Sequence, residues 1–70
     1  MTAEIRADMA ASVWKVVATD GAIVAAGDTI MILESMKMEI PVDAPIAGSV
    51  TIVAGEGSVV QENDVLAVIA

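Results

Sequence analysis

Short apolar runs alternate with turn residues along the whole chain. The runs are rich in Val and Ile, and Gly, Asp, Asn or Pro separates most of them. Runs of this length and composition are typical of β-strands, and no capped helical pattern interrupts them. The pattern therefore predicts an all-β fold of eight short strands. They are expected over Ala3–Arg6, Ser12–Val17, Ala22–Val24, Thr29–Glu34, Met38–Val42, Ser49–Val53, Ser58–Val60 and Val65–Ile69.

The eight predicted strands form two copies of one four-strand unit. Residues 21–33 match residues 57–69 at an offset of 36, and residues 7–13 match residues 44–50 at an offset of 37. Identical turn and apolar residues include Gly21/Gly57, Val24/Val60 and Asp28/Asp64. An internal repeat of this kind predicts quasi-two-fold symmetry within a single domain, residues 1–70, built as a small sandwich or flattened barrel.

Two details of the repeat make local predictions. The change of offset predicts that one copy has one loop residue more than the other, between Val17 and Gly21. Gly27 aligns with Asn63, and both residue types tolerate left-handed backbone, so a turn of the same hand is expected in both copies.

The residue composition excludes several functional classes. The chain has no Cys and no His, so it offers no disulfide framework, thiol redox centre, zinc-finger pattern or Cys or His nucleophile. We expect no catalytic residue and no metal site. Apolar residues make up 57% of the chain, and the single aromatic residue, Trp14, is expected to serve packing rather than recognition.

Ten acidic residues face three basic ones, which gives a formal charge of −7. This charge either matches a partner with a basic docking surface or keeps a very apolar domain in solution. Nucleic acid is not expected as a partner, because phosphate binding requires a basic patch. No apolar stretch follows Arg6, and no apolar run approaches the roughly 20 residues of a membrane span. We therefore expect a soluble, cytoplasmic protein with no membrane partner.

A predicted β-hairpin occupies the middle of the chain, where two apolar runs, 29–33 and 39–42, flank a polar segment. Tight hairpin loops favour Asn-Gly or Asp-Gly because their turns require positive φ, yet Met36-Lys37 stands at this tip. A local rule broken at such a place points to function, and the amine of Lys37 is the reactive group there. An ordinary solvated turn lysine, beside methionines that pack in a strand core, is the alternative.

The central segment, Glu34-Ser35-Met36-Lys37-Met38, resembles the attachment motif of the biotinyl domains of biotin-dependent carboxylases. That motif reads Glu, then Ala or Ser, then Met-Lys-Met. Both flanks are similar to the family's as well, in Val24-x-x-Gly27-Asp28-x-Ile30 and Ala44-Pro45-x-x-Gly48-x-Val50. The resemblance covers nearly the whole chain. It implies a flattened eight-stranded barrel-sandwich hybrid, with biotin joined by an amide bond to Lys37 at the tip of a hairpin.

The resemblance also implies a function and a set of partners. A biotin protein ligase would biotinylate Lys37, which would then carry carboxybiotin from a biotin carboxylase to a carboxyltransferase, with an acyl-CoA as the expected acceptor. The chain would be a carrier and not an enzyme, and a free monomer. The repeat leaves no room for the inserted thumb of some bacterial carriers, so a thumbless carrier is expected. Thumbless carriers are usually the tail of a longer carboxylase, but this domain begins at its own Met1, and a free-standing carrier is therefore expected. Met36 and Met38 would adapt to several partner surfaces, and Glu34 and Ser35 complete the site.

The sequence departs from the family pattern in one place. Residues 7–11 read Ala7-Asp8-Met9-Ala10-Ala11, where relatives tend to have a Pro and a Gly, and this puts the local turn in doubt but not the site. Two other functions remain open. A lipoyl carrier shares the fold but usually reads Asp-Lys-Ala at the tip, and the unmodified interaction module of transporter adaptor proteins lacks Met-Lys-Met.

Overall fold

The computed structural model describes residues 2–70, and its eight strands confirm the all-β prediction. Every predicted strand boundary lies within one residue of the observed one. The strands are β1 (Ala3–Arg6), β2 (Ala11–Val16), β3 (Ile23–Val24), β4 (Thr29–Ser35), β5 (Met38–Asp43), β6 (Gly48–Ile52), β7 (Val59–Val60) and β8 (Val65–Ile69). None of the described residues belongs to a helix long and apolar enough to cross a membrane.

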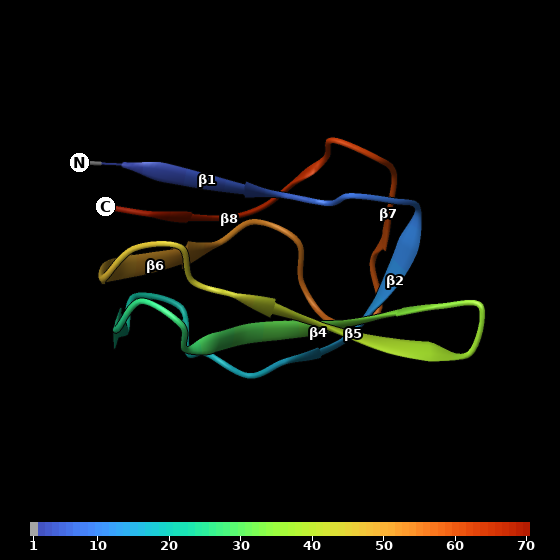
Figure 1. The fold of residues 1–70 in the computed structure, drawn as a ribbon, viewed down its shortest axis with the longest axis horizontal. Helices are drawn as coiled ribbons and strands as arrows, with labels where there is room; N and C mark the ends of the chain where they lie inside the picture. Colours follow the sequence, from blue (N-terminus) through green and yellow to red (C-terminus); the bar gives the residue numbers. More distant parts are fainter. Residues whose placement is uncertain (1) are drawn as a thin grey trace.

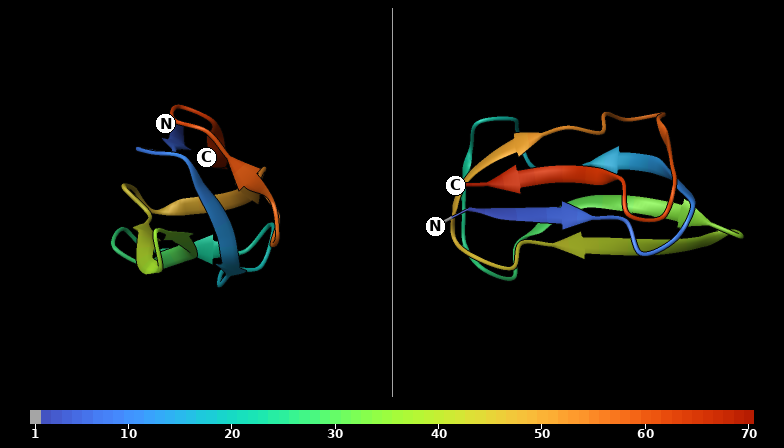
Figure 2. Two further views of the ribbon diagram at one scale, coloured as in Figure 1. Left: turned by 90° about the vertical axis from the view of Figure 1, so that its right-hand side faces the viewer. Right: turned by 90° about the horizontal axis from the view of Figure 1, so that it is seen from above.

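Two four-stranded antiparallel sheets face each other, as Figures 1 and 2 show. One sheet has the strand order β1-β8-β6-β3 and the other β5-β4-β2-β7, so each sheet takes two strands from each copy of the repeat. The two copies therefore interlock and share one core. Apolar side chains from both sheets fill this core, and its most deeply buried members are Ile30, Met31, Leu66, Ile69, Val13 and Val50. The flattened eight-stranded architecture is as predicted.

Equivalent backbone contacts in the two copies confirm the quasi-two-fold symmetry. Four pairs of hydrogen bonds correspond. They are Ala7 N to Asp64 O and Ala44 N to Asp28 O, Val13 N to Ser58 O and Val50 N to Ala22 O, Val16 N to Glu56 Oε1 and Ile52 N to Asp20 Oδ1, and Ala25 N to Asp28 Oδ2 and Gln61 N to Asp64 Oδ2. Gly27 and Asn63 both have positive φ, at 93° and 73°, so the turn of the same hand is also confirmed.

The additional residue of the first copy is Trp14, in the middle of β2, and the prediction of a loop residue between Val17 and Gly21 was wrong. Val13 pairs with Leu33 and Lys15 with Ile32, so Trp14 is a β-bulge residue without a partner of its own. In the second copy β6 pairs with β8 without interruption. A bulge changes the pairing register and not the residue types, so a self-comparison of the sequence located it only approximately.

The bulge also bears on the expected role of Trp14. Its side chain is 52% exposed and lies outside the buried core, which does not support the packing role that we expected.

The described chain ends lie at the end of the molecule opposite the β4–β5 hairpin. Figures 1 and 2 show the start of β1 and the end of β8 on one side and the hairpin projecting from the other. Two-fold symmetry accounts for this arrangement, because β4 and β8 are equivalent strands that run toward opposite ends of the molecule, and the hairpin follows β4. Pro41 lies in β5, an edge strand of its sheet, where a residue without an N–H group costs no ladder hydrogen bond. The hairpin tip therefore stands apart from the rest of the chain.

Candidate modification site at the tip of the β4–β5 hairpin

The hairpin closes with a two-residue turn. Ser35 pairs with Met38, which leaves Met36 and Lys37 as the turn residues. Their φ angles are 53° and 66°, so both adopt the left-handed conformation of a type I′ turn. The backbone thus has the geometry that tight hairpins favour, with residue types that usually avoid it. Left-handed backbone costs roughly 1–2 kcal/mol for each residue with a Cβ atom, so the turn is strained.

Core packing and one hydrogen bond anchor the base of the hairpin. Leu33 of β4 is buried in the core and pairs with Ile40 of β5, which is partly buried. The hydroxyl group of Ser35 donates a hydrogen bond of 3.2 Å to the carbonyl oxygen of Ala10, in the segment between β1 and β2. This contact joins residues 25 positions apart, and no local sequence signal predicted it. It gives Ser35 a structural role, because it fixes the last strand pair before the tip.

Beyond this base the side chains enter solvent. Lys37 is exposed, and the neighbouring Met36 and Met38 are 92% and 62% exposed. The alternative that these methionines pack in a strand core is therefore wrong. Across residues 2–70 the one ion pair joins Arg6 to Glu4, so no carboxylate holds the amine of Lys37. The amine is accessible from all sides of the tip.

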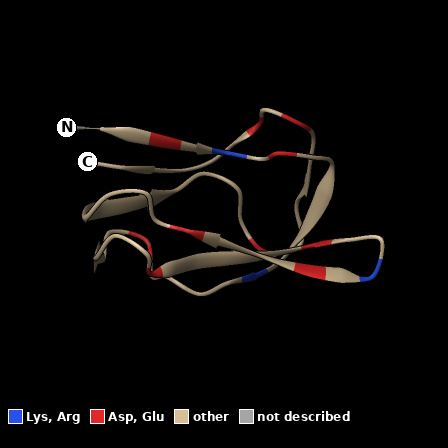
Figure 3. Ribbon diagram, in the orientation of Figure 1, with Lys and Arg blue, Asp and Glu red and all other residues tan. Residues whose placement is uncertain are grey.

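Two acidic residues lie immediately behind the tip. Glu34 and Glu39 are directly opposite each other in the strand pairing. Like charges in this position destabilise a strand pair, by a fraction of a kcal/mol. Figure 3 shows the basic residue at the end of the hairpin and the acidic segments on both strands behind it. The arrangement gives the tip a local field that attracts a basic partner surface.

The departure in residues 7–11 does not disturb the site. None of the residues Ala7 to Ala11 has a positive φ, so this segment requires no glycine. The equivalent of Ala11 in the second copy is Gly48, whose φ is 155°, and a Cβ atom there would lie 2.6 Å from the carbonyl oxygen of Ala70. A glycine is therefore required in one copy only.

The site brings together all five residues that the sequence singled out. Glu34, Ser35 and Met38 lie on the two strands, and Met36 and Lys37 form the turn. An exposed primary amine without an ionic partner, at the end of a rigid hairpin, suits acylation by an enzyme that must surround it. The residues present therefore fit a covalently attached biotin.

Known proteins place the chain in a family. The sequence pattern of the family described as "Biotin-requiring enzyme" matches residues 2–69. The chain belongs to this family. Within it, the biotinylated protein TB7.3 homologue of Mycobacterium leprae is 46% identical over 71 residues, and the similarity covers the whole of both chains.

Solved structures of the same family share the fold. The urea carboxylase of Kluyveromyces lactis superposes with a TM-score of 0.91 and 35% identity over all of this chain. A single-chain, multi-domain long-chain acyl-CoA carboxylase superposes with a TM-score of 0.86 and 35% identity over 96% of it. The biotinyl domain spans only 6% and 7% of those two chains.

These similarities confirm the expected family, the barrel-sandwich fold and biotin as the cofactor of the domain. The chain is a biotin carrier domain similar to those of carboxylases. Attachment at Lys37, with Met36, Met38, Glu34 and Ser35 around it, stays a prediction that rests on the motif and on the geometry of the tip.

Proposed function

We propose that the chain is a biotin carboxyl carrier protein in which Lys37 is the attachment point. The observation that supports it is the position of Lys37, exposed and without an ion pair at the strained end of a hairpin. Neither methionine beside it restricts access, since both are exposed. Among the three lysine and arginine residues of the chain, Lys37 alone stands at such a tip.

The chemistry proposed for Lys37 is the formation of one amide bond. The neutral amine attacks the carboxyl carbon of an activated biotin that a biotin protein ligase supplies from biotin and ATP. The Nζ–C bond forms, the activating group leaves with the bonding electrons, and the amine loses a proton. The amide nitrogen is not basic, so acylated Lys37 no longer carries the positive charge of a free lysine. The attached biotin supplies a ureido ring that can hold a carboxyl group.

The hairpin then acts as the rigid base of a long flexible tether. The four-carbon stem of Lys37 and the biotin chain allow the ring to reach two active sites in turn, which raises its effective concentration at each. We propose that these sites belong to a biotin carboxylase and a carboxyltransferase. Met36 and Met38, unbranched and polarisable, adapt to the different surfaces of these enzymes and of the ligase.

The class of molecule that accepts the carboxyl group is proposed from the family resemblance and from the name of one solved relative. The two solved relatives carry different acceptors in their names, urea and a long-chain acyl-CoA. We propose acyl-CoA, as the resemblance of the motif implied. We also propose that the carrier is monomeric and cytoplasmic, and that it catalyses neither half-reaction.

The carrier role can be tested by carboxyl transfer. The biotinylated chain would be incubated with a biotin carboxylase, ATP and radiolabelled bicarbonate, then separated from free label. We expect label on the wild-type chain and on Lys15→Ala, in which another exposed lysine is removed, and none on Lys37→Ala. Label on folded Lys37→Ala, or its absence from a fully biotinylated wild-type chain when the carboxylase is active on free biotin, would contradict the proposal.

A further inference from the structure

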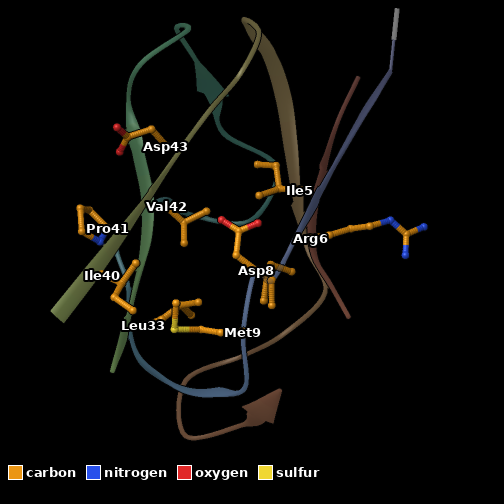
Figure 4. Close-up of a pocket in the computed structure, with 11 residues that line it drawn as sticks. Ile5, Arg6, Asp8, Met9, Leu33, Ile40, Pro41, Val42 and Asp43 are labelled. Atoms are coloured by element: carbon orange, nitrogen blue, oxygen red, sulfur yellow. The ribbon is translucent and has the colours of Figure 1, made fainter. Parts of the chain in front are cut away.

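A cavity of about 270 Å³ opens beside the base of the hairpin. It lies between β1 and β5, an edge strand from each sheet, which do not pair with each other. Residues 5–9 form one wall and residues 40–43 the other, and the buried side chains of Leu33 and Leu66 also line it. Figure 4 shows Met9, Leu33 and Ile40 close together at one end of this opening. The volume approaches that of small-molecule sites, which begin near 300 Å³.

An apolar path connects the cavity to the tip. Side chains alternate between the faces of a strand, so Met38 lies on the same face of β5 as Ile40, which lines the cavity. Met9, on the opposite wall, is 46% exposed. The hydrogen bond from Ser35 to Ala10 holds the segment that contains Met9 against the hairpin base. Exposed methionines thus stand both at the tip and at the cavity.

A biotin joined to Lys37 is long enough to follow this path. Ile40 lies three residues after Lys37, about 10 Å along an extended strand. Between the Cα atom of Lys37 and the bicyclic ring of biotin lie about eleven single bonds of roughly 1.5 Å, which span about 13 Å when extended. The ring therefore reaches the mouth of the cavity without any movement of the hairpin.

The cavity offers one uncommitted polar group. Arg6 donates to the carbonyl oxygen of Asn63 and to Glu4, and Figure 4 shows it extending away from the cavity. Asp43 accepts a hydrogen bond from the hydroxyl group of Thr29. Asp8 has no hydrogen bond or ion pair among the described side chains, and Figure 4 shows its carboxylate near Ile5 and Val42. A carboxylate here can accept the two N–H groups of a ureido ring, which are paired donors.

We propose that the cavity between β1 and β5 is a resting site for the biotin ring carried by Lys37 of the same chain. The proposal rests on the proposed attachment at Lys37. The apolar part of the ring and its chain pack against Met38, Ile40 and Met9, and the ureido N–H groups bond to Asp8. Docking covers the ureido nitrogen that receives the carboxyl group. The tether of Lys37 and biotin therefore has to leave the cavity before a biotin carboxylase can carboxylate the ring.

The internal repeat supports a role for Asp8 and Met9 at this end of the molecule. They align with Pro45 and Ile46 of the second copy. The turn that contains Pro45 and Ile46 joins β5 to β6 at the end opposite the hairpin, as Figure 1 shows. The carboxylate and the flexible thioether therefore occur only in the copy of this turn that faces the lysine.

The test compares nuclear magnetic resonance spectra of the unmodified and biotinylated chains, after an intact mass has shown one biotin. We expect amide shift changes at Asp8, Met9 and Ile40, and nuclear Overhauser effects between the biotin ring and the methyl groups of Met9 and Ile40. Asp8→Asn should lose most of the shift change at residues 8 and 9. Glu62→Gln, which removes a charge from an exposed residue that does not line the cavity, should keep it.

Two outcomes overturn the proposal in distinguishable ways. A singly biotinylated, folded chain whose shift changes stay within residues 35–39, with no ring contact to Met9, shows that the arm is free in solution. The resting site is then wrong while the attachment at Lys37 stands. A folded chain that gains no mass after incubation with a biotin ligase overturns the attachment itself, and the resting site with it.

Discussion

Two residues at the tip of the hairpin have a strained backbone conformation that other residue types would adopt with less strain. Met36 and Lys37 both have positive φ, where Asn and Gly would be at lower energy. Strain of this kind persists where the surrounding structure over-determines it, and it concentrates at functional sites. The sequence indicated the site because the residue types disagree with the turn. It did not reveal that the backbone would adopt the type I′ geometry all the same.

Replacing Met36 by Asn should therefore stabilise the fold while weakening recognition of the tip. We expect the free energy of unfolding to rise by about 0.5–1 kcal/mol, because Asn tolerates left-handed backbone better than Met. Urea denaturation measures this. Met38→Asn, at the neighbouring position without positive φ, is the matched control and should bring no gain. Equal effects of the two substitutions would contradict the strain argument.

Gly48 is constrained by space as well as by backbone conformation. Its Cβ atom would lie 2.6 Å from the Ala70 carbonyl oxygen and 2.9 Å from Cγ2 of Ile69, at a φ of 155°. We expect Gly48→Ala to lower the free energy of unfolding by about 1–3 kcal/mol. Gly55→Ala, with no atom within 4 Å of its Cβ atom, should change it by less than about 0.5 kcal/mol. Comparable melting temperatures for the two variants would show that this region relaxes freely.

At the scale of the elements, local sequence patterns predicted where the strands lie. The same patterns did not predict which residues pair between strands that are far apart in the chain. Apolar runs and turn residues set the boundaries of all eight strands to within a residue. The bulge at Trp14 depends on which residues pair across β2 and β4, and the hydrogen bond from Ser35 to Ala10 joins segments far apart in the chain. The cavity between β1 and β5 likewise depends on how the edge strands of two different sheets lie in the folded chain. None of these three features has a local sequence signature.

The bulge allows a deletion that an ordinary strand would not tolerate. Removing Trp14 should give β2 the uninterrupted register that β6 has in the second copy, so we expect the chain to fold with a cooperative transition. Removing Thr51 from β6 should prevent folding, because a slip of one residue turns every later side chain of the strand to the opposite face. Circular dichroism during thermal unfolding distinguishes the two. Loss of the folded state in both deletions would contradict the assignment of Trp14 as the additional residue.

At the scale of the whole molecule, the two ends differ: the hairpin lies at one end and the described chain ends lie at the other. The quasi-two-fold axis places the described chain ends at one end and the hairpin with Lys37 at the other (Figures 1 and 2). The formal charge of −7 is consistent with either of the two roles expected for it, solubility of an apolar domain or attraction of a basic partner surface. The symmetry of the repeat accounts for this arrangement, because the hairpin is the connection between the two copies.

The attachment of biotin at Lys37 is the central claim, and mass spectrometry tests it most directly. The chain, Lys15→Ala and Lys37→Ala would each be incubated with a biotin protein ligase, ATP and biotin, and their intact masses measured. We expect one biotin increment on the first two and none on Lys37→Ala, with peptide mapping placing the increment at residue 37. A folded wild-type chain without an increment, or an increment that persists in Lys37→Ala, would contradict the account.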